Sequence, residues 1–162
     1  MTRSTAAIFL LTVLLLSVGC SRDGVVPCNG PAESLQSRIV RISYGTSFGW
    51  CVGYCRAEIN AANNQVQYAM DGWSTVKPVV CSKEITCEEW ASVTGNINVA
   101  TFFSLPETIG CPDCADGGAE WIEIETSAST HRVTFEYGVE PQELSPYVDE
   151  LRDLMLSFKD CN

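Results

Sequence analysis

The chain has 162 residues, with 20 acidic side chains against 10 basic ones and a formal net charge of −10. This balance argues against a nucleic-acid partner, because binding to phosphates requires a basic surface. It argues equally against binding of anionic lipid headgroups through protein charge. The length suits one domain with a substantial hydrophobic core.

Residues 1–19 have the layout of a secretory signal peptide, in which Arg3 precedes an apolar run over 6–18. As a helix this run would reach only about 20 Å, short of a hydrocarbon core of about 30 Å. The sequence therefore predicts a removable signal peptide over 1–19 and not a spanning helix.

The residues 16–20, with sequence LSVGC, resemble the lipobox of bacterial lipoproteins. This resemblance implies that Cys20 is acylated and becomes the mature N-terminus, with the membrane as a partner through the lipid. Ser21 then resembles the sorting signal for the outer membrane of a Gram-negative cell. The alternative is ordinary cleavage near Gly19, which would leave Cys20 as a plain thiol.

The region 20–36 is polar and rich in Gly and Pro, which is typical of a tether, and we expect a single domain over 37–162. Alternating apolar residues in this domain predict five strands, at 38–44, 55–60, 65–71, 120–126 and 131–137.

A helix is predicted over 83–94, with a further helical turn within 98–105. A second helix begins at Ser145 as N-cap with Pro146 in the first helical position, and continues through Val148, Leu151 and Met155 at helical spacing. Short connections between these elements favour an α+β fold: a mostly antiparallel sheet of about five strands, packed by two helices and braced by disulfides.

Nine cysteines are an odd number, and a lipid on Cys20 would leave eight for disulfides in an oxidising compartment. Spacing favours a link between Cys28 and Cys161, near the two ends of the mature chain, and a small loop between Cys81 and Cys87. The remaining four, Cys51, Cys55, Cys111 and Cys114, form either two local bridges or two cross-links between loops.

Cys111 and Cys114 have the C-x-x-C spacing of thiol–disulfide exchange proteins. Two glycines follow shortly afterwards, at 117 and 118, where such proteins begin a helix, so a structural bridge is favoured. Zinc held by these two cysteines with Cys51 and Cys55 is an alternative, although disulfides compete with zinc in an oxidising compartment. We expect no metal and no cofactor.

Other candidate groups have simpler interpretations. Asp113, Asp116 and Glu120 lie beside two glycines, but their spacing does not match a calcium loop, and a solvated acidic turn is favoured. His131, the single histidine, is expected at the rim of the core. Glu123 and Glu125, which share a strand face with Trp121, are expected to be solvated and not a catalytic pair.

Phe48, Trp50 and Tyr54 lie close together in a glycine-rich segment and are a possible binding patch for a protein or a glycan. Trp73 and Trp121 belong to the same group of aromatic residues. The alternative is that these rings pack over the disulfides.

The C-x-G-x-C motif at 51–55 and the sequence GCPDCADGG at 110–118 resemble an uncharacterised family of bacterial secreted proteins and lipoproteins. The resemblance implies export and an α+β domain, without an assigned activity. We therefore expect a lipid-anchored module of the cell envelope that binds a protein or glycan partner. The alternative is a secreted thiol–disulfide or metal-dependent enzyme centred on Cys111 and Cys114.

Overall fold

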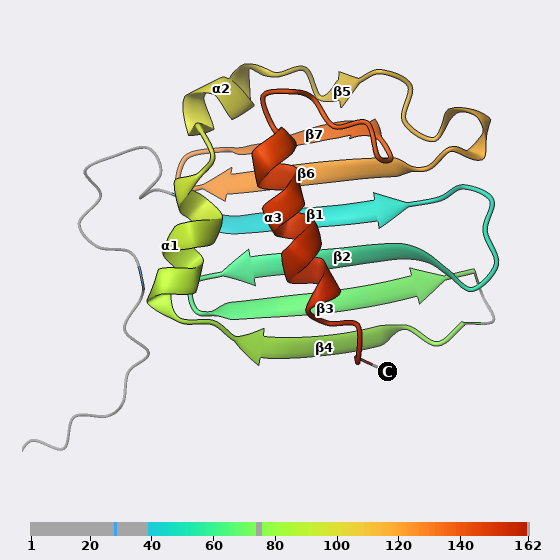
Figure 1. Cartoon of the computed structure of the whole chain (residues 1–162), viewed down its shortest axis with the longest axis horizontal. Helices are drawn as coiled ribbons and strands as arrows, with labels where there is room; N and C mark the ends of the chain where they lie inside the picture. Colours follow the sequence, from blue (N-terminus) through green and yellow to red (C-terminus); the bar gives the residue numbers. More distant parts are fainter. Residues whose placement is uncertain (1–27, 29–38, 74–75, 162) are drawn as a thin grey trace, which may run out of the picture.

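The computed structural model describes residues 28, 39–73 and 76–161 (Figure 1). The predicted signal peptide at 1–19, the lipidation site at Cys20 and the tether at 20–36 lie outside the described residues, apart from Cys28. None of the described helices is long and apolar enough to cross a membrane.

The centre of the fold is one sheet of seven strands in the order β4-β3-β2-β1-β6-β7-β5. All neighbouring strands are antiparallel except β5, which pairs in parallel with β7. The α+β class is confirmed, but the prediction of about five strands was too small. The strands are β1 (Ile39–Ser47), β2 (Tyr54–Ala62), β3 (Gln65–Gly72), β4 (Val79–Glu84), β5 (Thr108–Ile109), β6 (Ala119–Thr126) and β7 (Thr130–Glu136).

The two unpredicted strands, β4 and β5, lie at the two edges of the sheet. The residues of β4 alternate only between half-buried and exposed, so their apolar periodicity is weak. The helix predicted over 83–94 begins only at Cys87, and Lys83 and Glu84 are the last two residues of β4. β5 has only two residues, too few for any periodicity.

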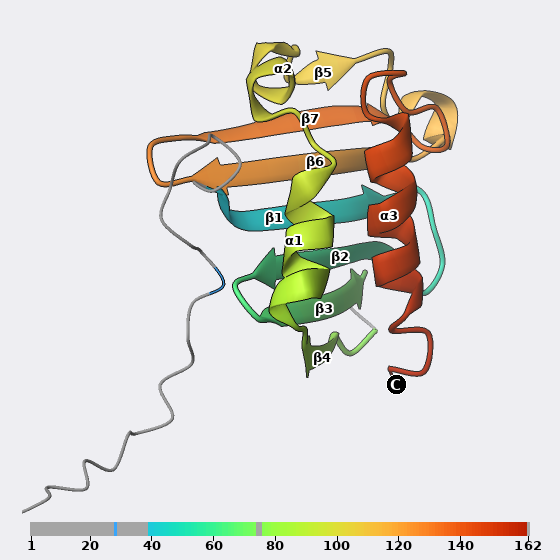
Figure 2. The same ribbon diagram turned by 60° about the vertical axis from the view of Figure 1, so that its left-hand side comes forward.

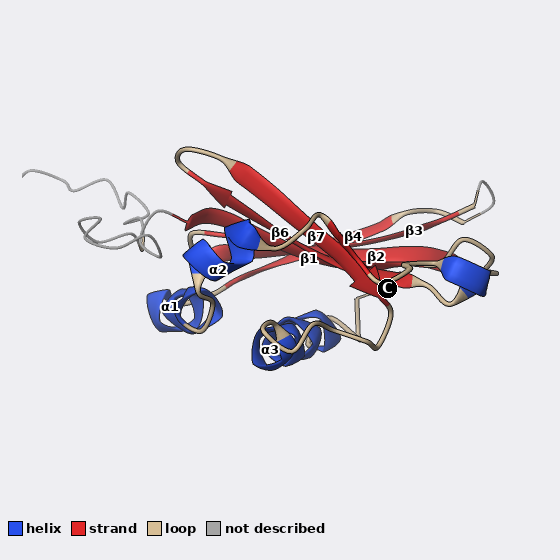
Figure 3. Ribbon diagram, turned by 90° about the horizontal axis from the view of Figure 1, so that it is seen from above, coloured by secondary structure: helices blue, strands red, loops and turns tan. Residues whose placement is uncertain are grey.

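Three α-helices accompany the sheet: α1 (Cys87–Gly95), α2 (Val99–Ser104) and α3 (Ser145–Leu156). Helices α1 and α3 lie on the same face of the sheet (Figure 3), whereas α2 lies beside β5, beyond β7 (Figures 1 and 2). No helix among the described residues covers the opposite face, which we call the open face.

The starts of the helices follow local chemistry. Thr86 caps α1 through a capping box, since its hydroxyl accepts from the Glu89 amide and the Glu89 carboxylate accepts from the Thr86 amide. The prediction of Ser145 as the N-cap of α3 was wrong by one residue, because Leu144 occupies that position without a side-chain cap. Pro146 still lies in the first turn, where its missing amide hydrogen is not needed.

The core lies between the sheet and the helices α1 and α3. The sheet contributes fully buried side chains from its central strands, among them Ile42, Ile59 and Ile122, and α3 contributes Val148 and Leu151. Each of these side chains, once buried, stabilises the fold by about 1.5–3 kcal/mol relative to an exposed one. Burial of the apolar side chains of α3 therefore supplies most of the free energy that holds this helix against the sheet.

Four disulfides brace the fold and link Cys28 to Cys87, Cys51 to Cys55, Cys81 to Cys161, and Cys111 to Cys114. The two local bridges were one of the predicted alternatives. Four bridges in a chain of this size are typical of an oxidising environment.

The favoured pairs Cys28–Cys161 and Cys81–Cys87 were wrong. Tyr68, the register partner of Cys81, stacks on Phe158 with ring centroids 5.3 Å apart. This contact brings the chain end that follows α3 onto the edge strand β4, so that Cys161 meets Cys81. Cys87, in the first turn of α1, is left to bind Cys28.

We predict that the long disulfides contribute most to stability. Replacing Cys81 and Cys161 together by Ser should lower the free energy of unfolding by about 4 kcal/mol, because their sequence separation is 80 residues and opening so long a loop restores chain entropy. Replacing Cys111 and Cys114, only 3 apart, should cost about 2 kcal/mol or less on the same scale. Urea unfolding measures both, and equal losses would contradict the prediction.

Candidate functional site

Three loops gather at one end of the sheet, the right-hand end in Figure 1, which we call the loop end. They follow β1, follow β3 and precede β6. Asp113 ties the first loop to the third, because its Oδ1 accepts from the amides of Gly49 and Gly118, each at 3.2 Å. The loop end is therefore held together by hydrogen bonds to the backbone as well as by two local disulfides.

The two most exposed large apolar side chains of the described residues, Val52 and Trp50, lie at this end, together with Trp73. Trp50 is 84% exposed, Val52 is fully exposed and Trp73 is 64% exposed. Gly49, Trp50, Cys51 and Trp73 line a cleft of about 440 Å³, which we call the aromatic cleft. Exposed tryptophans beside a cleft are typical of binding surfaces.

The predicted patch of Phe48, Trp50 and Tyr54 is only partly brought together. Phe48 turns away from the cleft and packs on Tyr137, with ring centroids 4.9 Å apart. Tyr54 is 45% exposed and its hydroxyl donates to the carbonyl of Lys77 at 3.4 Å, without lining the cleft. Trp73, which was not included in the predicted patch, takes the place beside Trp50.

A signal for Trp73 exists in the sequence. β2 and β3 form an antiparallel hairpin in which Tyr54 pairs with Gly72. The residue after Gly72 must therefore lie next to the loop that precedes β2. Gly72 is also needed for this close approach, because a Cβ atom there would lie 2.0 Å from the carbonyl oxygen of Gly53.

Cys111 and Cys114 form an exposed disulfide beside a small cavity of about 150 Å³. No α-helix begins there; a three-residue turn at Cys114–Asp116 leads into β6. Glu136 accepts from the Cys111 amide at 2.8 Å, and Asp113 and Asp116 are near in sequence. These carboxylates oppose formation of the thiolate that exchange chemistry requires.

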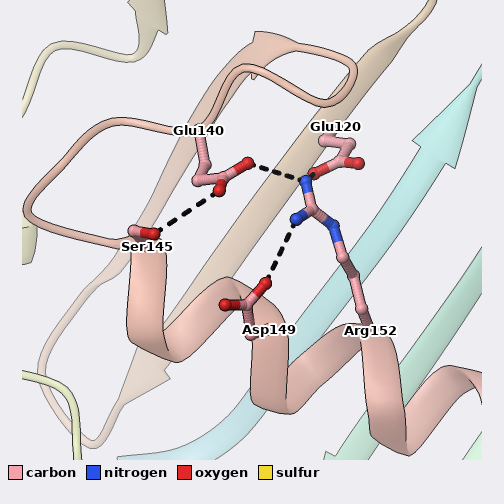
Figure 4. Close-up of polar contacts among 5 residues, drawn as sticks. All are labelled: Glu120, Glu140, Ser145, Asp149 and Arg152. Carbon is pink, nitrogen blue, oxygen red and sulfur yellow. Dashed lines mark hydrogen bonds and ion pairs between the residues drawn. The ribbon is translucent and has the colours of Figure 1, made fainter.

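A second polar arrangement joins α3 to Glu120 at the start of β6, and Figure 4 shows its side chains. Arg152 Nη2 donates to Glu120 Oε2 and to Glu140 Oε2, each at 2.8 Å, and Arg152 Nη1 donates to Asp149 Oδ1 at 3.3 Å. Ser145 donates to the other oxygen of Glu140 at 3.4 Å. We call Glu120, Glu140, Asp149 and Arg152 the Arg152 cluster.

Glu120 is the unexpected member of this cluster. It was interpreted as part of a solvated acidic turn, yet it is 1% exposed. It stands on β6 opposite Thr46 of β1, on the face that α3 covers. In a strand, residues two apart lie on the same face, so Glu120 shares the face of the apolar residues Ile122 and Ile124. This spacing is the signal in the sequence that could have predicted the burial of Glu120.

The electrostatics of the cluster follow from its burial. Loss of hydration raises the pKa of Tyr44, which is 1% exposed, and the neighbouring charge of Glu120 raises it further. Burial by itself would lower the pKa of Arg152, but its hydrogen bonds to Glu120 and Glu140 outweigh this and raise it. The hydrogen bond from Arg152 lowers the pKa of Glu140.

The remaining predicted residues have structural roles. His131 lies at the rim of the core, with Nε2 at 2.9 Å from the carbonyl oxygen of Leu105 and its ring against Phe102 and Phe103. Glu123 and Glu125 lie on the open face and pair with Arg132 at 2.9 Å and Arg41 at 2.5 Å. Among the described residues no three potential metal ligands of the His, Cys, Asp or Glu type lie together.

The Glu140 ion pair predicts a specific dependence of stability on pH. The pKa of Glu140 is lower in the folded protein than its ordinary value of 4.5, so its contribution is present above that value and is lost as the pH falls below it. Glu140→Gln should remove about 1 kcal/mol at neutral pH and flatten this acid limb. Urea unfolding from pH 7 to pH 3 measures the effect. Glu143→Gln, at an exposed neighbouring position, is the control and should keep the wild-type profile.

No protein-family model matches the chain, and no curated protein is found to be similar to it. The function must therefore be inferred from the structure of this chain, in which two features are candidates: the aromatic cleft and the Arg152 cluster.

Proposed function

We propose that this chain is a lipid-anchored module of the cell envelope that binds a protein partner through the aromatic cleft. The observation that supports this most directly is the exposure of Trp50 and Trp73, both of which line one cleft. Tryptophan is enriched among the residues that dominate binding energy in protein interfaces. Leaving two such rings in water has an energetic cost that a partner would remove.

The character of the cleft favours a protein over a glycan. Among the described residues that line it, Gly49, Trp50, Cys51 and Trp73, the side chains offer only the two indole N–H groups as hydrogen-bonding groups of ordinary strength. A sugar needs several such groups to bind its hydroxyls, whereas apolar side chains of a protein partner need only contact area. The exposed Val52 and Tyr54 nearby extend the apolar surface.

The position of the cleft suits an anchored protein. β1 begins at Ile39, immediately after the region that joins the domain to Cys20, and the cleft follows the other end of this strand. A strand of nine residues spans roughly 30 Å, so the cleft lies about that far from the end of β1 to which an anchor on Cys20 would be joined.

Export is supported by the signal-like sequence at 1–19, by four disulfides, and by the resemblance to an uncharacterised family of bacterial secreted proteins and lipoproteins. The alternative function, a secreted thiol–disulfide or metal-dependent enzyme centred on Cys111 and Cys114, has weaker support. Its disulfide is exposed, but the surrounding carboxylates disfavour a reactive thiolate.

Site-specific photo-crosslinking in cells tests the cleft. A photoreactive amino acid at Val52, which is fully exposed beside the cleft, should form adducts with a protein, and the pair Trp50→Ala and Trp73→Ala should reduce their yield at least tenfold. Both rings are largely exposed, so these changes should alter the free energy of unfolding by less than about 0.5 kcal/mol per site. The same probe at Val80, 59% exposed on the edge strand β4, is the matched control. Equal adducts at both positions, or adducts with glycan alone, would refute the proposal.

Metabolic labelling with radioactive palmitate tests the anchor. The wild-type chain should incorporate label and fractionate with membranes, because several acyl chains give a durable attachment. Cys20→Ala should lose the label and leave the membrane fraction. Label that persists in Cys20→Ala would place the lipid elsewhere, and a wild-type chain without label would rule out the anchor.

A further inference from the structure

A cavity of about 220 Å³ lies between α3 and the sheet, beside the Arg152 cluster. Its buried polar wall is formed by Tyr44 and Glu120, each only 1% exposed, together with Arg152. Tyr137 and Leu156, which are 49% and 65% exposed, line its outer part. The cavity therefore combines a deep polar wall with apolar side chains near solvent.

The charges around this cavity do not balance. Arg152 is bound by three carboxylates, those of Glu120, Glu140 and Asp149. The cluster therefore has more negative than positive charge, although only Glu120 and Arg152 line the cavity and Asp149, whose side chain is 67% exposed, is screened by water. An anionic ligand would be repelled here, although an arginine lines the cavity.

Glu120 also has unused hydrogen-bonding capacity. Its Oε2 accepts from Arg152, whereas its Oε1 has no hydrogen-bond partner among the residues that the structure describes. Glu120 is not among the described residues whose fully buried polar atoms lack a partner, so Oε1 keeps some accessible area, and the cavity that Glu120 lines is where a donor can reach it. A ligand with N–H donors and a positive charge would donate a hydrogen bond to Glu120 Oε1 and would also offset the negative charge of the Arg152 cluster.

We propose that this cavity binds an alkylammonium or alkylguanidinium group, carried by a free amine or by a lysine or arginine side chain of a partner. The cationic head donates to Glu120, and Tyr44 and Tyr137, which also line the cavity, supply aromatic rings to which a cation is attracted. The alkyl stem lies against Leu156 near the entrance. This proposal does not depend on the aromatic cleft having a partner.

Titration by two-dimensional amide NMR tests it, using the exported protein with its disulfides intact and n-butylammonium chloride as the probe. The amides of Thr46, Glu120 and Tyr137 should shift and saturate. Sodium butyrate and n-butanol, of similar size but negative or neutral, should leave these amides in place. A response to butyrate or butanol equal to the response to butylammonium would overturn the proposal.

Two variants locate the binding group. Glu120→Gln should weaken butylammonium binding at least tenfold, whereas Glu123→Gln, on the open face, should not change it. Since Glu120 also binds Arg152, Leu156→Lys provides a second variant at an exposed position, where a tethered ammonium should compete with the probe and weaken binding comparably. Unchanged binding in Leu156→Lys, or in a folded Glu120→Gln protein, would overturn the proposal.

The crosslinking assay separates the two sources of the cation. If a side chain of the protein partner occupies the cavity, Leu156→Lys should also lower the adduct yield at Val52. If a free amine occupies it, this yield should stay at the wild-type level while butylammonium binding falls. Because the NMR titration needs no partner, its result is independent of whether the aromatic cleft binds one.

Discussion

The ion pair between Glu120 and Arg152 fixes the relation between the sheet and α3. Glu120 is 1% exposed, and a carboxylate so deeply buried must be compensated. Arg152 is its only hydrogen-bonding partner in the described part of the chain. Apolar contacts alone would let the helix slide or rotate at small cost, whereas this pair holds α3 at one position over β6. Beyond the C-terminus of α3, the stacking of Phe158 on Tyr68 and the Cys81–Cys161 bridge fix the following segment to β3 and β4.

The open face of the sheet is covered by none of the described helices (Figure 3), so its side chains must be compatible with water. Its side chains form cross-strand pairs, such as Arg132 with Glu123 and Ser43 with Asn60. Even Trp121 is protected there: its ring lies over Gly45, where a Cβ atom would be 2.3 Å from the ring, and the guanidinium of Arg132 lies 4.0 Å from the ring centroid. Charged pairs and a covered ring thus account for much of this face. The exposed tryptophans of the loop end stand out against this background.

The sequence predicted what depends on periodicity and missed what depends on contacts between distant segments. Alternation identified β1, β2, β3, β6 and β7, and helical spacing identified α3, because burying one face imposes these periods. The edge strand β4 buries little and so carries little signal. The partner of Cys81 depends on where the end of α3 docks, which no local pattern encodes. The presence of Trp73 in the cleft in place of Phe48 has the same origin, since the pairing of β2 with β3 brings Trp73 to the loop that carries Trp50. The burial of Glu120 was not predicted, because a carboxylate usually lies in water and only the alternation with Ile122 and Ile124 indicates that it faces the core.

The disulfides divide into two kinds whose physical effects differ. Cys28–Cys87 and Cys81–Cys161 close long loops and so act on the unfolded chain, whose entropy they reduce. Cys51–Cys55 and Cys111–Cys114 close loops of only 4 and 3 residues and gain little in this way, yet both lie at the loop end. Their effect is on the folded state, where they restrict the backbone that carries Trp50 and Val52 and the turn that carries Asp113. A surface whose loops are already ordered loses less entropy when a partner binds. The local bridges therefore act mainly on the shape of the loop end, which is the surface that the proposed function uses.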